Sequence, residues 1–145
     1  MTREEISQAI DSAFAAYSAG DLDGFVADFA DDMVYEDNSR PEPLHGREAF
    51  KAYASGWLEA SSDGSIVPVR KIIEGDEVVA ELRFEATHDR GPMYGVEPAG
   101  TRFAFNFTIV ASFAGGRLTR LKAFYNPLTV LQALGVVGEV PTSPR

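Results

Sequence analysis

The chain has 145 residues, a formal net charge of −9 and no cysteine. Without cysteine, it has no disulfide framework, no thiol nucleophile and no thiolate metal site. The acidic charge argues against a nucleic-acid partner, because phosphate binding requires a basic surface, and we interpret the acidity as a solubilising surface. The apolar and charged fractions, 45% and 24%, are typical of a folded protein. We expect one domain over residues 1–145, with a tail at 136–145.

The first residues predict an amphipathic helix. Thr2 followed three residues later by Glu5 is a capping-box pattern. The apolar stripe of this helix consists of Ile6, Ile10, Ala13, Phe14 and Tyr17. No apolar segment typical of a secretory signal precedes it, and no apolar run in the chain is long enough to span a bilayer. We therefore expect a soluble, cytoplasmic protein without a membrane partner.

A turn, a short second helix and a strand are predicted next. Gly20 is expected to follow the end of the first helix and Asp21 to cap the second. Apolar residues of the second helix fall at helical spacing: Leu22, Phe25, Val26 and Phe29. From Met33 onward the period changes to two, which predicts a strand.

Asp37 lies at the end of that strand, on the same face as Met33 and Tyr35. A carboxylate with apolar neighbours can serve as a general base that removes a proton next to a carbonyl. In the alternative interpretation, Asp37, Asn38 and Ser39 begin a turn, and the carboxylate accepts hydrogen bonds from nearby N–H groups. The residues alone leave both interpretations open.

Residues 38–44 contain two prolines and are predicted to form a loop. Gly46 then opens a third helix, whose apolar face carries Phe50, Tyr53, Ala54, Trp57 and Leu58. Pro127 opens a short last helix over residues 128–134.

Between these helices, residues 65–126 predict antiparallel strands, with turns at 74–76 and 115–116 and a long loop at 89–100. One strand has an apolar face of Val78, Ala80, Leu82, Phe84, Ala86 and His88. The next has Phe103, Phe105, Phe107, Ile109, Ala111 and Phe113 on one face. Helices followed by strands indicate an α+β fold, with helices packed on one face of a curved antiparallel sheet.

Three motifs in the first third resemble the opening half of bacterial ketosteroid isomerases: AGDLDG at 19–24, FADD at 29–32 and VYED at 34–37. These enzymes share the nuclear transport factor two-like fold with the SnoaL-like polyketide cyclases. The resemblance implies a cone-shaped sheet with a pocket inside. It also implies that Asp37 is the proton-shuttling base.

The chain departs from the isomerase pattern at two positions. The oxyanion-hole tyrosine would fall at Ala13 and the second, protonated acid near Ile109, and both positions are apolar here. Loss of one such donor typically costs ~2.7–4 kcal/mol of transition-state stabilisation. Steroid isomerisation is therefore not expected, unless Tyr17, Tyr53 or Tyr94 supplies a substitute donor.

The C-terminal part carries a second resemblance, in GGRL at 115–118, FYNP at 124–127 and LQALG at 131–135. These motifs look like the ending of SnoaL-like cyclases and, more closely, of the phenazine-biosynthesis A/B family. Asn126 stands where the cyclases have a catalytic Asp. Ala123 and Tyr53 stand where the phenazine proteins have a Glu and a pocket His. Both resemblances specify the fold better than the reaction.

The remaining charged candidates are few. His88 is either a pocket acid or base or a strand-end histidine half in water, and His45 is expected in a loop, bonding the start of the third helix. Two isolated histidines give no metal-site spacing. Arg83 and Glu85 resemble the Arg-x-Asp pair of limonene-epoxide hydrolases, but alternation places both opposite the apolar row, on the outer face of the sheet.

The favoured hypothesis is a SnoaL-like cyclase or isomerase of secondary metabolism. It would act on an apolar, polyketide-like intermediate by holding a reactive conformer, by proton transfer or by a pericyclic route. The expected catalytic residues are Asp37, Asn126 and Tyr53. The expected substrate-binding residues are Tyr17, Tyr35, Trp57, Phe84, His88, Tyr94, Phe105, Phe107 and Tyr125.

Two alternatives remain: a non-catalytic protein that binds an apolar ligand, and a protein-interaction module whose cone is filled by bulky side chains. For all three functions we expect a homodimer through the outer face of the sheet. No cofactor and no metal is expected.

Overall fold

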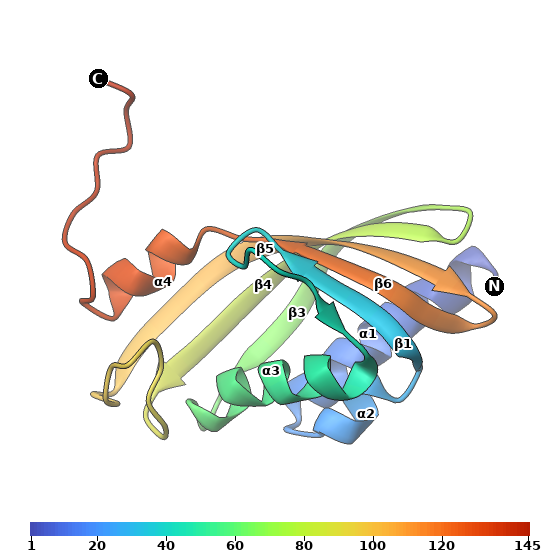
Figure 1. The fold of residues 1–145 in the computed structure, drawn as a ribbon, viewed down its shortest axis with the longest axis horizontal. Coiled ribbons are helices and arrows are strands. Elements are labelled where there is room, and N and C mark those ends of the chain that lie inside the picture. The colour runs from blue at the N-terminus through green and yellow to red at the C-terminus, as the bar shows by residue number, and fades with distance from the viewer.

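The computed structural model describes residues 1–145 and has a strongly curved six-stranded sheet with helices across its concave side (Figure 1). The helices are α1 (Arg3–Ser18), α2 (Leu22–Val26), α3 (Arg47–Glu59) and α4 (Pro127–Ala133). The strands are β1 (Phe29–Asp37), β2 (Leu44–His45), β3 (Ser65–Glu74), β4 (Glu77–His88), β5 (Thr101–Ala114) and β6 (Arg117–Phe124). The expected α+β class, with three N-terminal helices on a curved sheet, is confirmed.

The N-terminal helices form where their caps were predicted. Glu5 donates its backbone N–H to the Thr2 hydroxyl at 3.1 Å, and Thr2 donates its own to the Glu5 carboxylate at 2.9 Å, which completes the capping box. Gly20 follows α1 with a φ of +77°, and the Asp21 side chain caps α2 by accepting from the backbone N–H of Gly24. These local bonds stop the first helix and redirect the chain within a few residues.

The second helix is shorter than expected. It ends at Val26, and β1 already begins at Phe29, which was predicted to continue the helical stripe. Phe29 pairs with Leu118 of β6. The backbone partners that β6 offers in the folded state outweigh the local helical spacing, because a five-residue helix has little stability of its own.

The strand order is β2-β1-β6-β5-β4-β3. Strands β3 to β6 are antiparallel, as predicted for residues 65–126, whereas β1 lies parallel to β6 and places Asp37 opposite Ala123. β2 was expected to be loop, and it pairs with Val34 and Tyr35 of β1 instead. His45 therefore lies in this edge strand.

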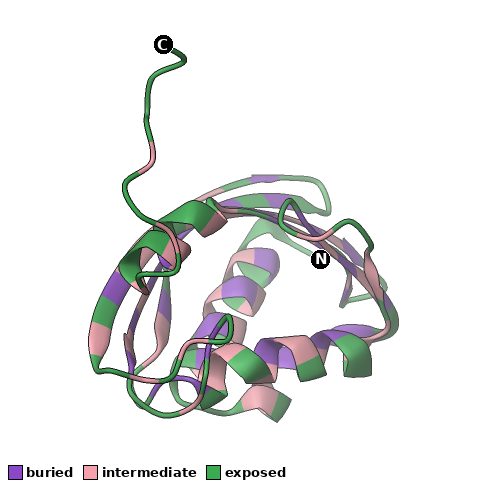
Figure 2. Ribbon diagram, turned by 60° about the vertical axis from the view of Figure 1, so that its left-hand side comes forward, coloured by how far each residue is buried: buried purple, intermediate pink, exposed green.

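The core lies between the concave face of the sheet and the helices, where the buried sides of the elements face one another (Figure 2). The stripe predicted for α1 is buried at Ile6, Ile10, Phe14 and Tyr17. Lys71 of β3 bonds Ser7 and Asp11 of α1, which fixes this helix against the sheet edge. None of the helices has the length and apolar character needed to cross a membrane. Residues beyond α4 extend away from the sheet (Figure 1).

Candidate active site

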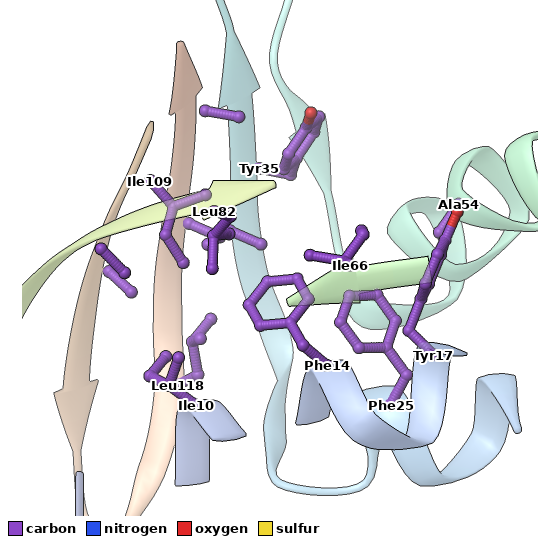
Figure 3. Packing of buried hydrophobic residues seen from close by; sticks show 14 of the residues in the cluster. Ile10, Phe14, Tyr17, Phe25, Tyr35, Ala54, Ile66, Leu82, Ile109 and Leu118 are labelled. Carbon is purple, nitrogen blue, oxygen red and sulfur yellow. The ribbon is translucent and has the colours of Figure 1, made fainter. Parts of the chain in front are cut away.

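An apolar cavity of about 90 Å³ lies inside the cone. Figure 3 shows Phe14 and Phe25 of the helices pointing toward the sheet, and Tyr17 extending beside Ala54 of α3. All sixteen lining residues are hydrophobic: Phe14, Tyr17, Phe25, Tyr35, Phe50, Tyr53, Ala54, Trp57, Ile66, Phe84, Phe105, Phe107, Ile109, Leu121, Ala123 and Tyr125. The polar side-chain groups available in this wall are the tyrosine hydroxyls and the indole N–H of Trp57. The volume is below the ~150 Å³ of an engineered cavity that holds a benzene ring.

A second, larger space of about 390 Å³ lies at the mouth of the cone, and we call it the vestibule. Its lining consists of Ser39, Arg40, Tyr53, Gly56, Trp57, Pro92, Met93, Tyr94 and Tyr125. Tyr53, Trp57 and Tyr125 line both the vestibule and the cavity, so these three rings form the partition between them. A molecule as large as one aromatic ring would therefore extend from the cavity into the vestibule.

Asp37 is 6% exposed and lines neither space. Its Oδ2 accepts from the hydroxyls of Tyr35 at 2.9 Å and Tyr53 at 3.3 Å. Its Oδ1 accepts from the backbone N–H and the hydroxyl of Ser39 at 2.8 and 2.5 Å. Donors therefore meet both carboxylate oxygens, which suits an acceptor-only, ionised group. The turn that the sequence left as an alternative is present, together with the two tyrosine contacts.

A chain of hydroxyls connects Asp37 to the surface. The Ser39 hydroxyl lies 2.9 Å from the hydroxyl of Tyr125, which lies 3.3 Å from that of Tyr94. Tyr94 is 47% exposed and sits in the loop between β4 and β5 with a φ of +50°, in the left-handed region. The buried carboxylate is therefore linked to the vestibule by side chains from three separate segments.

The hydroxyls of the site are held in their protonated form. Burial raises the pKa of Tyr17, Tyr35, Tyr53 and Tyr94 well above the usual tyrosine range. The negative charge of Asp37 adds to this rise in pKa for Tyr35, Tyr53 and Tyr94. At neutral pH these residues are hydrogen-bond donors rather than phenolates.

Tyr17 differs from the other tyrosines of the site, because its hydroxyl makes no hydrogen bond to another protein group although it lines the cavity. This hydroxyl borders the open space of the cavity and is not sealed inside the protein. Tyr17 is therefore a donor that a bound oxygen atom could satisfy. It is also one of the three residues that the sequence offered as replacements for the missing oxyanion-hole tyrosine.

The structure brings together most of the predicted site residues. Those that line the cavity or the vestibule are Tyr17, Tyr35, Tyr53, Trp57, Phe84, Tyr94, Phe105, Phe107 and Tyr125. His88 and Asn126 do not line either space. His88 is buried and donates from Nε2 to the carbonyl of Gly91 at 2.7 Å, which holds the start of the β4–β5 loop. Asn126 is exposed and caps α4 by accepting from the backbone N–H of Leu128.

The outer face of the sheet carries a charged group that is separate from the site. Arg83 bonds Glu85 at 2.9 Å on this face, as the alternation predicted, and Arg102 bonds both Glu85 and Asp63. The backbone N–H of Thr87, and after it the Thr87 hydroxyl, hold the pKa of Asp63 below its usual range by hydrogen bonding to its carboxylate. The pair that resembled the hydrolase motif is thus a surface ion pair. No three His, Asp or Glu side chains are grouped so that they could hold a metal ion.

Two residues of the site were missed from the sequence. Ser39 supplies two of the bonds to Asp37, and Arg40 lines the vestibule with its guanidinium carbon 5.3 Å from the centre of the Tyr53 ring. A serine two residues after an aspartate is a turn pattern that could have indicated the first. Nothing local indicates the second, because the position of Arg40 depends on how loop 38–44 packs on α3.

A curved sheet closed by three helices around an apolar cavity defines a cone of the nuclear transport factor two-like superfamily. Within it, the chain belongs to the SnoaL-like family, since the model of the SnoaL-like domain matches residues 10–121.

Solved structures with this fold include three bacterial proteins. AclR, a candidate hydroxylase from Streptomyces galilaeus, is 23% identical with a TM-score of 0.86, over 97% of this chain and 87% of AclR. A candidate SnoaL-like polyketide cyclase from Jannaschia sp. CCS1 is 21% identical with a TM-score of 0.82, over 93% of this chain and 94% of its own. TsrD from Streptomyces laurentii is 22% identical with a TM-score of 0.83, over 94% of this chain and 99% of TsrD. At these identities the likeness shows the fold.

Proposed function

We propose that this protein is a cyclase or isomerase of secondary metabolism that acts on an apolar, polyketide-like small molecule. The observation that carries the proposal is an apolar cavity whose polar groups are protonated tyrosine hydroxyls and the indole N–H of Trp57, with the Tyr17 hydroxyl left without a protein partner. Such a wall binds a carbon skeleton and orients a carbonyl oxygen. Membership of the SnoaL-like family supports the same class of reaction.

The cavity contributes first by confining the substrate. Holding a flexible chain in one reactive conformer can lower a barrier by ~7–11 kcal/mol in favourable cases. Tyr17 would donate to a carbonyl oxygen and stabilise negative charge that develops on it, whereas the single hydroxyl proton of Tyr53 is directed at Asp37. A reaction that moves no proton, such as a pericyclic ring closure, needs nothing more from the protein.

A reaction that removes a proton also needs Asp37. The substrate meets Tyr53 rather than the carboxylate, so the proton would travel in two concerted transfers. The phenolic oxygen of Tyr53 takes the proton from carbon while its own proton passes to Oδ2 of Asp37, leaving an enolate and a neutral aspartic acid. Reversal of both transfers returns the proton to a different carbon, which is an isomerisation.

Thermal unfolding against a panel of polycyclic enones, macrolactones and terpenoids tests the proposal. A ligand at about 100 times its dissociation constant should stabilise the protein by ~2.7 kcal/mol, a shift of several degrees for this size of chain. Ala54→Leu places a larger side chain in the cavity and should abolish the rise in unfolding temperature caused by the ligand. Ala52→Leu, on the exposed side of α3, should leave this rise unchanged. Turnover of the stabilising compound is then measured for wild type and Asp37→Asn.

The outcomes separate the alternatives. A stabilising compound that is converted by wild type but not by Asp37→Asn supports proton transfer, and equal conversion supports catalysis by confinement. A stabilising compound that is never converted indicates a ligand-binding protein. No shift with any compound, in wild type as in Ala54→Leu, would contradict the proposal and favour an interaction module with a filled cone.

We also propose a homodimer through the outer face of the sheet. Several large apolar side chains on β3 and β4 remain exposed: Val67, Val69, Ile72 and Val79. Ile72 and Val79 are paired across the two strands, so they form one patch. Light scattering should give twice the 15.7 kDa of one chain for wild type and a lower mass for Ile72→Lys. A monomeric wild type would contradict this proposal without affecting the cavity.

A further inference from the structure

We infer that Arg40 binds a carboxylate of the substrate at the mouth of the cone, so that the ligand is an apolar molecule with one acidic end. This inference rests on the proposed function, because it places the apolar end of that ligand in the cavity. The apolar lining of the cavity by itself implies a neutral substrate, and this inference adds a carboxylate to it.

The basic side chains that are not fully exposed carry the argument. They are Arg40, Arg47, Lys51, Lys71 and Lys122. Four of them form ion pairs: Arg47 with Asp31 at 2.8 Å, Lys71 with Asp11 at 2.6 Å, Lys51 with Asp23 and Lys122 with Glu36. Arg40 forms none, in a chain with 22 acidic residues.

The hydrogen-bonding groups of Arg40 are also unused. Its Nε is buried and has no acceptor. No other buried side-chain nitrogen or oxygen of the protein lacks a hydrogen-bond partner. Buried polar groups are nearly always bonded, and each exception needs a physical explanation. Asp37, three residues earlier, does not serve as the acceptor, because hydroxyl and amide donors already meet both of its oxygens.

The surroundings of Arg40 orient it for a ligand. Its guanidinium lies over the ring of Tyr53, an arrangement that attracts the cation and limits its motion. Because Tyr53 belongs to the partition, a molecule that passes it has one end in the cavity and the other in the vestibule beside Arg40. The planar fork of an arginine side chain matches the two oxygens of a carboxylate. The cavity of about 90 Å³ takes the apolar end, and the charged end stays in the larger space.

The fluorescence of Trp57 provides a direct test, because this is the only tryptophan of the chain and it lines both spaces. The probes are hexanoate and hexanamide, whose alkyl chains are narrower than an aromatic ring and which differ in charge and hardly in shape. At pH 7 we expect both to change the emission of Trp57 and the acid to bind at least tenfold more tightly. Arg40→Gln should bring the two dissociation constants to within about twofold and leave that of the amide unchanged. Arg40→Lys should restore part of the preference, because it restores the charge without the fork.

Arg90→Gln is the matched control, since Arg90 is exposed, forms no ion pair and lines neither space. It should keep the full preference for the acid. Equal binding of acid and amide by wild type, or a preference that survives Arg40→Gln, would overturn the assignment of Arg40 and leave the cavity proposal intact. Binding of neither probe to wild type, together with no stabilisation by any compound of the thermal panel, would overturn the cavity proposal and this inference with it.

Discussion

The phenolic oxygen of Tyr53 lies 3.3 Å from Oδ2 of Asp37, and the ring of the same tyrosine separates the apolar cavity from the vestibule. Asp37 lines neither space, so Tyr53 is the side chain through which the carboxylate can act on a ligand. This relationship makes Tyr53, rather than the acid alone, the residue on which the chemistry of the site depends. It also means that the two tyrosines that bond Asp37 differ in role: we expect Tyr35 to contribute mainly to stability and Tyr53 mainly to function.

Asp37→Asn should lower the free energy of unfolding by about 1–3 kcal/mol at pH 7. The amide cannot accept from donors on both sides, and the charge-assisted bonds from Tyr35 and Ser39 become weaker neutral ones. Urea unfolding measures the difference. Asp32→Asn is the control, because Asp32 is exposed and makes no side-chain bond, and it should change little. Equal stability of the two variants would show that the donors do not depend on the charge of Asp37.

Tyr17→Phe should change the free energy of unfolding by less than about 1 kcal/mol, because it removes a hydroxyl that faces the cavity and bonds no other protein group. The same change should weaken binding of any ligand whose oxygen accepts from this hydroxyl. Thermal unfolding with and without the best compound of the panel measures both effects on one sample. A clear loss of stability in the absence of ligand would indicate that the hydroxyl is bonded in the free protein.

Tyr35→Phe and Tyr53→Phe should separate structure from function. Tyr35 is buried and bonds Asp37 at 2.9 Å, so its loss leaves the carboxylate short of a donor and should cost about 1–2 kcal/mol of stability. Tyr53 is less buried and its bond is longer at 3.3 Å, so its removal should cost less. If Tyr53 relays the proton, its variant should lose turnover of a proton-transfer substrate. The prediction fails if Tyr35→Phe is the more stable of the two.

Stability should fall steeply as the pH rises above about 10. In the unfolded chain tyrosines ionise near pH 10, whereas burial raises the pKa of Tyr17, Tyr35 and Tyr53 in the folded protein. Above pH 10 the unfolded state therefore holds fewer protons than the folded state, so higher pH favours unfolding. Each such tyrosine should contribute about 1.4 kcal/mol per pH unit. Below pH 9 this contribution to stability should not depend on pH.

Urea unfolding between pH 8 and 11.5 measures this slope, and absorbance at 295 nm follows ionisation of the phenols. Tyr17→Phe should reduce the slope by about 1.4 kcal/mol per pH unit, because it removes one tyrosine whose pKa is raised by folding. A phenol signal that rises near pH 10 while the protein is still folded would contradict the raised pKa values.

Local patterns predicted much of the architecture because they are enforced by bonds within a few residues. The capping box of Thr2 and Glu5, the turn at Gly20 and the outward position of Arg83 were all predicted from spacing, and the structure confirms them. Alternation also predicted that Tyr35 and Asp37 share a strand face, which their 2.9 Å bond requires.

The sequence by itself therefore determined the α+β class, the family and the aromatic composition of the interior face. Only the tertiary structure decided that β1 lies parallel to β6, that the cavity holds about 90 Å³, that His88 bonds a loop carbonyl, and that Arg40 has no partner. These features depend on segments far apart in the chain, such as Ser39 and Tyr125 in the hydroxyl chain. Distances between such segments follow from packing of the whole sheet against the helices, and no periodicity within one element encodes them.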